Sequence, residues 1–229
     1  MNNHEYTGKD NLEVMSEAFK YNHFLLGMIL ALAKNDQLIV DFGAGSGTFA
    51  RSVTMAGHRL LCVEVDNSLA YNLKCQGLTV VRSLDEIEDR SVDFIYSLNV
   101  LEHIKDDTAV LHLWNKKLRF GGDVFIYVPA FQFLYSSMDR KVGHFRRYTR
   151  SDLCAKVSNA GFRIVEANYV DSLGVLATLA YKAMKRDNGG INSKTLHFYD
   201  SYIFPLSRTL DAITCGVIGK NVYVQAKNL

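Results

Sequence analysis

The chain has 229 residues, of which 48% are hydrophobic and 22% are charged, as in an ordinary globular domain. This length supports one α/β domain with a hydrophobic core and is short for two. The 26 Lys and Arg residues against 24 Asp and Glu residues leave a net charge of +2, which excludes a protein that coats nucleic acid, so we expect no nucleic-acid partner.

The cysteines, the N-terminal residues and the apolar stretches indicate the cellular compartment. Four cysteines without a C-x-x-C pair exclude a disulfide scaffold, and no secretory signal opens the chain. The longest apolar stretch, residues 173–184, is too short to cross a bilayer and contains Lys182. We therefore expect a cytoplasmic protein without a transmembrane segment. The apolar helices expected near the C-terminus would cap the acceptor site or pack against the core, with weak contact to a membrane surface as the alternative.

Hydrophobic spacing predicts helices alternating with strands through the first half of the chain. We expect helices at 13–34, 46–56, 68–76 and 106–118, and strands at 38–42, 60–64, 79–82, 92–98 and 123–128. Strands that are apolar throughout are typical of a parallel sheet covered by helices on both faces.

The alternation pauses after Pro129 and resumes at Thr149, which with Asp152 resembles a capping box and opens a helix that ends at Gly161. Two further strands and two apolar helices follow. The expected strands are 162–170 and 222–226, the latter at an edge of the sheet, and the expected helices are 173–185 and 203–217.

A glycine-rich turn, Asp41 to Gly47 with the sequence DFGAGSG, follows the first predicted strand and precedes a predicted helix. Glycines in this context let the backbone approach a ligand closely. Glu64 closes the next strand, where a carboxylate can accept both hydroxyl hydrogens of a ribose. The alternative is a tight turn beside a surface acid.

The carboxylate of Asp41 narrows the choice of nucleoside cofactor. It would repel the pyrophosphate of a dinucleotide, and the glycine spacing is G-x-G-x-G where dinucleotide sites prefer G-x-G-x-x-G. The same carboxylate suits S-adenosylmethionine, which carries an ammonium and a sulfonium and no phosphate. A nucleotide-dependent oxidoreductase and a non-catalytic cofactor-binding module stay open as alternatives.

The glycine turn, Glu64 and the segment Val92–His103, which ends in Val-Leu-Glu-His, together resemble the class I S-adenosylmethionine-dependent methyltransferases. The resemblance implies a Rossmann-like, doubly wound α/β fold with seven strands, the last antiparallel, and helical insertions after strands five and six. It also implies one methyltransferase domain over 1–229. Its expected parts are an N-terminal helical lid (1–36), a cofactor-binding core (37–129), and acceptor-side insertions that complete the sheet (130–229).

The resemblance further implies which residues bind S-adenosylmethionine. Asp41, Gly43 and Gly45 would face the methionine part, as would Asn99 after the fourth strand. The other cofactor-binding candidates are Glu64, which would hold the ribose, Val65 next to it, and Ser83 and Leu84 beside the adenine. The family often has Asp where Ser83 stands, although a hydroxyl can also bond to an adenine amino group.

The segment after strand five is dense in polar and aromatic side chains and is expected at the ligand-binding edge of the sheet. Its run Gly-His-Phe-Arg-Arg-Tyr resembles a bacterial subgroup of these methyltransferases associated with polysaccharide, glycolipid or small-molecule biosynthesis. This implies a small-molecule, glycan or glycolipid acceptor, methylated on a hydroxyl oxygen. The candidate substrate-binding residues are Tyr135, Arg146, Arg147 and Tyr148.

A hydroxyl acceptor benefits from a general base, for which His144 is the first candidate and Asp139 the second. Alternatively, His144 is a loop residue that only forms hydrogen bonds. The nearby arginines are either a solvated surface or a site for a phosphate or carboxylate of the acceptor. His103 is expected to be structural. No Cys and His spacing typical of zinc occurs, so we expect no metal.

Overall fold

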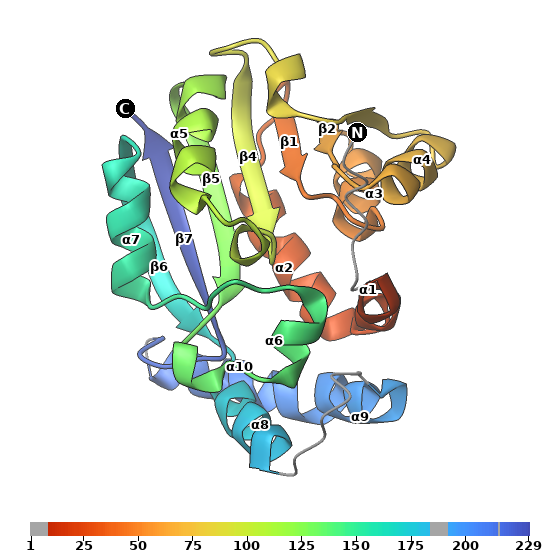
Figure 1. Cartoon of the computed structure of the whole chain (residues 1–229), viewed down its shortest axis with the longest axis vertical. Helices are drawn as coiled ribbons and strands as arrows, with labels where there is room; N and C mark the ends of the chain where they lie inside the picture. The colour runs from red at the N-terminus through yellow and green to blue at the C-terminus, as the bar shows by residue number, and fades with distance from the viewer. Residues whose placement is uncertain (1–8, 184–191, 215) are drawn as a thin grey trace.

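The computed structural model describes residues 9–183, 192–214 and 216–229, and its centre is one seven-stranded sheet (Figure 1). The strands lie in the order β3-β2-β1-β4-β5-β7-β6. They are β1 (Leu38–Phe42), β2 (Arg59–Val63), β3 (Thr79–Val81), β4 (Val92–Leu98), β5 (Leu118–Pro129), β6 (Phe162–Val170) and β7 (Asn221–Asn228). Strands β1 to β5 pair in parallel, whereas β7 runs antiparallel to both β5 and β6, which confirms the predicted fold class.

The position of β7 corrects one prediction. The alternating segment 222–226 was expected at an edge of the sheet, but β7 lies between β5 and β6, and β6 forms the edge. The polar positions of β7 have partners inside the sheet, since the Tyr223 hydroxyl donates to Glu166 of β6. Its alternation therefore reflects cross-strand bonding and not exposure to water.

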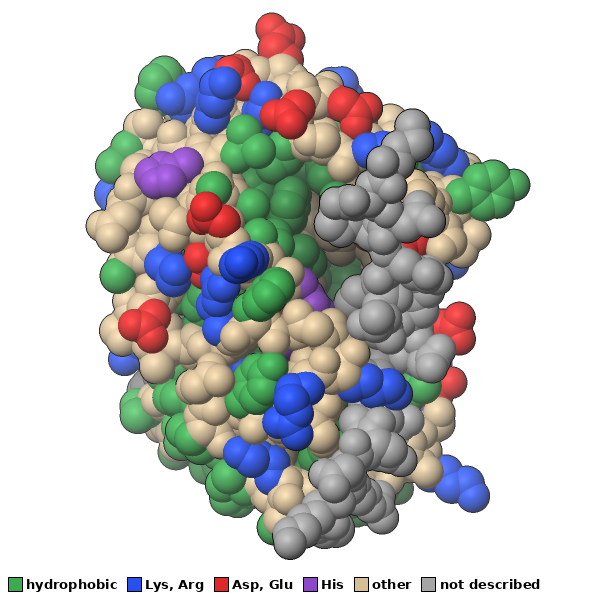
Figure 2. All heavy atoms as spheres, in the orientation of Figure 1, with side chains coloured by type: hydrophobic (Ala, Val, Ile, Leu, Met, Phe, Trp, Pro, Cys, Tyr) green, Lys and Arg blue, Asp and Glu red, His purple; other side chains and the backbone are tan. Residues whose placement is uncertain are grey.

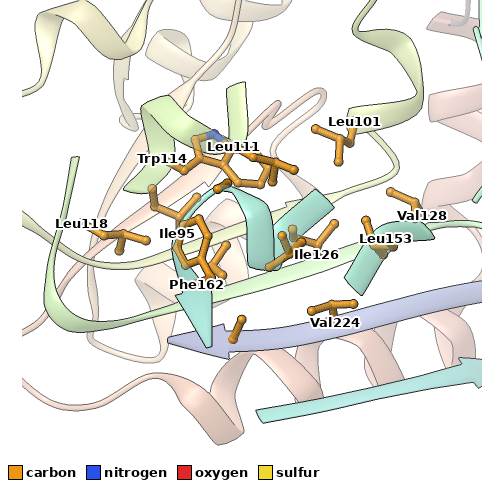
Figure 3. Close-up of a cluster of buried hydrophobic side chains, with 14 of the residues drawn as sticks. Ile95, Leu101, Leu111, Trp114, Leu118, Ile126, Val128, Leu153, Phe162 and Val224 are labelled. Atoms are coloured by element: carbon orange, nitrogen blue, oxygen red, sulfur yellow. The ribbon is translucent and has the colours of Figure 1, made fainter. Parts of the chain in front are cut away.

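Helices cover both faces of the sheet (Figure 1). On one face Leu111 and Trp114 of α5 and Leu153 of α7 pack against β4, β5 and β7 (Figure 3). On the other face Leu25 and Ile29 of α2 pack against β4 and β5. The helices are α1 (Lys9–Ser16), α2 (Phe19–Leu32), α3 (Thr48–Met55), α4 (Asn67–Cys75), α5 (Asp107–Lys117), α6 (Ser137–Val142), α7 (Arg150–Asn159), α8 (Ser172–Ala183), α9 (Ser193–Phe198) and α10 (Phe204–Ile213). Within these described ranges, no helix combines the length and apolarity needed to cross a membrane.

The helix predicted over 13–34 is two helices, because α1 ends at Ser16 and α2 begins at Phe19. The residue before α2 is Ala18, whose side chain cannot cap a helix. The carboxylate of Asp200 instead accepts the backbone N–H groups of Lys20 and Tyr21, each at 2.9 Å. A cap supplied from another element fixes where α2 begins.

Trp114 is fully buried and meets the Phe42 ring edge-to-face at 5.0 Å. We expect Trp114→Ala to lower the free energy of unfolding by about 3–5 kcal/mol, because it removes a large buried ring and leaves a cavity. Urea unfolding followed by circular dichroism measures the change. The control Met55→Ala, at a side chain that is 88% exposed, should stay within about 0.5 kcal/mol of the wild type. Equal losses in both variants would contradict this account of the core.

Candidate active site

The residues singled out from the sequence follow the carboxyl ends of the five parallel strands β1 to β5. The chain crosses to opposite sides of β1 to form β2 and β4, so the strand order reverses there, and open α/β sheets bind ligands at such a point. Figure 2 shows this face of the molecule hollowed near its centre, with hydrophobic and histidine side chains in the recess.

The glycine turn approaches two neighbouring segments closely. Gly43 has a φ of +81°, and a Cβ added to it would lie 2.4 Å from a methyl carbon of Val100, so no side chain fits. Gly45 has a φ of +56°, and its added Cβ would lie 3.6 Å from Leu12 of α1. The turn is therefore packed between the β4 end and the N-terminal helix, and its close approach to both depends on the absence of side chains at these glycines.

Glu64 joins this turn to the end of β2. Its Oε2 accepts the Gly45 N–H and its Oε1 accepts the Asp66 N–H, each at 2.9 Å. Burial raises the pKa of Glu64, while the two backbone hydrogen bonds oppose that shift. Each carboxylate oxygen retains a lone pair that can accept a further hydroxyl hydrogen.

The residues expected beside the ribose and adenine lie next to Glu64 along the same edge. Val65 is 58% exposed, an apolar surface available to a planar ring. Ser83 caps a short helix (η1, Leu84–Glu86), since its hydroxyl accepts the Asp85 N–H at 3.1 Å. The Leu84 side chain is buried beneath it.

Asp41 is buried at the start of the glycine turn, where the Tyr96 hydroxyl donates to its Oδ2 at 2.8 Å. Burial raises its pKa from 3.8 to about 7, against the lowering effect of the Tyr96 hydrogen bond, and the nearby Glu64 raises it further. A cation bound here would be favoured, because it offsets the cost of the buried charge.

Three non-glycine residues with left-handed backbone follow the ends of β4, β5 and β6. They are Asn99, Phe131 and Asp171, with φ values of 53°, 60° and 69°. Such conformations cost free energy and persist where the surrounding structure enforces them. The Asn99 N–H donates to the Tyr127 carbonyl at 2.7 Å, and its side chain hydrogen-bonds with Tyr21, so it projects from the β4 end toward the ligand edge.

A second group of side chains comes from the insertion after β5. Asp139 is buried and accepts from His144 Nδ1 at 2.7 Å and from Arg147 at 2.8 and 2.9 Å. Burial alone would raise the pKa of Asp139, but the hydrogen bonds from His144 and Arg147 outweigh it and hold the pKa well below its usual range. Asp139 is thus an ionised group that orients the imidazole.

The other ring nitrogen of His144, Nε2, lies 3.7 Å from Oε1 of Glu102. Glu102 is fully buried, neither of its oxygens has a hydrogen-bond partner, and burial raises its pKa to about 8. The His103 ring meets the His144 ring edge-to-face at 4.5 Å, and burial lowers the pKa of His103 to about 4. Sequence reasoning noticed Glu102 only as part of a strand motif.

The four predicted acceptor-binding residues separate into two pairs. Tyr135 and Arg147 lie beside His144. The Tyr135 hydroxyl donates to the His144 carbonyl at 2.7 Å, and Arg147 donates to Asp139, which also binds the His144 ring. Arg146 and Tyr148 instead bind Asp107, each at 2.8 Å, and Tyr148 is buried. Asp107, which the sequence reading did not single out, anchors this insertion to α5.

Comparison with known proteins agrees with this geometry. A family profile described as "Methyltransferase domain" matches residues 17–167. A SAM-dependent methyltransferase from Archaeoglobus fulgidus is 18% identical with a TM-score of 0.61, covering 90% of this chain and 94% of that one. For a putative sarcosine dimethylglycine methyltransferase from Galdieria sulphuraria the values are 16%, 0.62, 92% and 86%.

A third structure, Haemonchus contortus phosphoethanolamine N-methyltransferase 2 in complex with S-adenosyl-L-methionine, is 18% identical with a TM-score of 0.60. The match covers 88% of this chain and 52% of that one. No curated protein matches the chain. At these identities the solved structures establish the shared fold.

The raised pKa of Asp41 predicts a pH-dependent stability. The unfolded carboxyl ionises near 3.8 and the folded one near 7, so stability is lost as the pH rises between these values. We expect Asp41→Asn, which keeps an acceptor for Tyr96 and carries no charge, to be more stable than the wild type at pH 8, by up to about 4 kcal/mol.

Urea unfolding at a series of pH values compares the two proteins. The curves should converge below pH 4, where the Asp41 carboxyl is protonated in both states. Parallel curves across this range would show that Asp41 has an ordinary pKa in the folded chain.

Proposed function

The chain belongs to the methyltransferase-domain family and is an S-adenosylmethionine-dependent enzyme of class I, and we propose that it methylates a hydroxyl oxygen of a small-molecule, glycan or glycolipid acceptor. The observation that carries this proposal is the Asp139–His144 pair beside the carboxyl end of β4. A histidine oriented by a buried carboxylate is suited to remove a proton from a hydroxyl group.

The residues at the strand ends fit the cofactor. S-adenosylmethionine, when bound, supplies a methyl group on a sulfonium. Glu64 offers two carboxylate oxygens for the ribose hydroxyls, and Asp41 offers negative charge toward the cationic end, with Gly43, Gly45 and Asn99 alongside. Val65, Ser83 and Leu84 are proposed to bind the adenine side.

His144 is proposed to accept the proton of the acceptor hydroxyl. Because the Asp139 carboxylate is ionised and can only accept, we assign the proton of the neutral ring to Nδ1, which leaves the lone pair on Nε2. Nε2 takes the proton, and the Asp139 carboxylate stabilises the resulting positive charge. Because its own pKa is held low, Asp139 is the second choice for the base. Arg147 and Tyr135 are proposed to line the acceptor site, with Arg146 and Tyr148 behind them.

The helices after β6 support a glycolipid acceptor and contact with a membrane surface. Tyr202, Leu206 and Ile213 recur at helical spacing along η4 (Tyr199–Ile203) and α10, and all three are exposed. The acidic residues of these two elements, Asp200 and Asp211, are buried, so this surface presents no carboxylate to an anionic lipid. A cytoplasmic location and the absence of a nucleic-acid substrate complete the proposal.

The whole chain is proposed to act as one domain, in which residues 1–36 form a lid. The approach of Leu12 to the glycine turn supports the lid, although residues 1–8 lie outside those that the structure describes. Residues 37–129 would bind the cofactor and 130–229 the acceptor.

Glu64→Ala is expected to weaken S-adenosylmethionine binding by about 2–4 kcal/mol, because it removes a charged acceptor for two hydroxyl groups. Isothermal titration calorimetry measures the affinity, and circular dichroism checks the fold. The matched control is Glu88→Ala, at an exposed carboxylate outside the site. Unchanged affinity for the cofactor would remove Glu64 as the ribose ligand, and tight binding of NAD instead would favour an oxidoreductase.

His144→Ala is expected to lower the methyl-transfer rate on the true acceptor by about 10²–10⁴, the usual contribution of a general base. Cofactor affinity should barely change, because Glu64 and the glycine turn carry that binding. The control His112→Ala alters an exposed histidine on α5. Activity near the wild-type rate would remove His144 from the mechanism, and loss of activity together with cofactor affinity would mark it as structural.

A further inference from the structure

We propose that Glu102, His103 and His144 form a binding site for a divalent transition-metal ion at the acceptor side of the active site. Each residue offers one ligand atom, and these atoms all lie within 4.8 Å of one another. The set combines two imidazole nitrogens with one carboxylate.

The buried carboxyl group of Glu102 is the strongest sign of a missing partner. Among the residues that the structure describes, it is the buried carboxyl with neither oxygen in a hydrogen bond. An unpartnered polar group in the interior costs free energy, and a buried charge costs far more. A cation bound between Glu102 and the two histidines would give this carboxyl group a partner and offset the cost of its charge.

The histidines are already held as metal ligands usually are. A metal-bound imidazole commonly donates its other ring N–H to a carboxylate or a backbone carbonyl, which fixes the ring and makes the ligand nitrogen more basic. Asp139 is such a carboxylate for Nδ1 of His144, at 2.7 Å. The His103 ring hydrogen-bonds with the backbone at Val142 and Gly143. In this arrangement Nε2 of His144 is the atom directed at Glu102.

The cluster is also fixed by local backbone contacts. Glu102 and His103 lie in one short helix (η2, Leu101–His103) directly after β4. The Phe145 N–H, next to His144, donates to the Glu102 carbonyl at 2.8 Å. The segments that carry the three ligands are therefore joined to each other before any ion binds, so little ordering accompanies binding.

The ligand chemistry selects the class of ion. Imidazole nitrogen suits zinc, copper, iron and nickel, whereas magnesium and calcium prefer oxygen ligands. Two histidines and one carboxylate occupy three positions and leave at least one open, as in catalytic metal sites. Glu102 is buried while His144 and His103 are partly exposed, so the open side is the one that faces the acceptor.

The consequence for mechanism rests on the proposed function. An ion at this position would occupy the Nε2 lone pair of His144, so the same imidazole would be the base in the metal-free protein and a ligand in the metal-bound one. We expected no metal because the sequence lacks the Cys and His spacings typical of structural zinc sites. The adjacent Glu102 and His103 are the part of this cluster that the sequence makes visible.

Metal binding is tested on the whole chain, stripped with EDTA and without cofactor or acceptor. We expect ZnCl₂ to bind with one equivalent per chain by calorimetry, and CoCl₂ to produce visible d–d absorption. His144→Asn and Glu102→Gln should each weaken binding by at least about 100-fold. His103→Asn, checked for folding by circular dichroism, serves if Glu102→Gln does not fold.

Two controls separate this site from surface binding. His112→Asn should bind as the wild type does. His197 lies 3.3 Å from Glu17 at the surface and is the rival His–Glu pair, so His197→Asn should also retain binding. No stoichiometric binding, or binding that only His197→Asn abolishes, would overturn the metal site.

Calorimetry with S-adenosylmethionine on the same samples keeps the two proposals distinct. Cofactor binding and methyl transfer by a protein that binds no metal would overturn the metal site and leave the proposed function intact. Stoichiometric metal binding by a protein that transfers no methyl group would support the site and contradict the proposed function.

Discussion

The buried carboxylate of Asp139 is the interaction on which the acceptor side of this active site depends. It accepts hydrogen bonds from Ser136, His144 and Arg147, three residues of the segment between β5 and α7. The regular structure of that segment is limited to the short helices η3 (Gln132–Leu134) and α6. Without an ionised group at its centre, the imidazole and the guanidinium would both lose the carboxylate that orients them.

The buried carboxyl groups that the structure describes differ in how they are satisfied. Asp107 is paired with Lys156, Arg146 and Tyr148, and it anchors the insertion after β5 to the start of α5. Asp41 and Glu102, at the carboxyl ends of β1 and β4, have raised pKa values because burial is poorly compensated. Poorly compensated carboxyl groups at the ligand edge are the kind of perturbed group that marks a binding site.

The sequence predicted the sheet well and its connections less well. The strands 92–98 and 162–170 have the predicted bounds, because the pattern of hydrophobic residues along a strand is a local property. The start of α2 depends on Asp200, which is distant in sequence, so no local pattern could reveal it. The position of β7 between β5 and β6 likewise depends on tertiary contacts, because an alternating sequence is equally compatible with an edge strand.

The same limit applied to the site. The glycine turn and Glu64 were recognisable because their spacing follows from one βαβ unit, and the structure joins them through the Gly45 N–H. The contact between Glu102 and His144 links two loops after different strands, and the Tyr96–Asp41 hydrogen bond links two strands. Pairs of this kind exist only once the sheet has formed.

The poorly compensated carboxyl groups of Asp41 and Glu102 affect the stability of the fold. Each lowers the stability of the ligand-free chain, because a buried carboxyl must either ionise without a full set of partners or take up a proton. A cation beside Asp41 or Glu102 offsets that cost. Part of the binding free energy of such a ligand therefore comes from relieving an unfavourable burial that is already present in the ligand-free fold. Ligands that bind only the folded state then raise its stability by mass action. The active site therefore contains buried carboxyl groups that lower the stability of the ligand-free fold and favour the binding of a cation. Asp139, which is fully paired, instead stabilises the segment that carries His144.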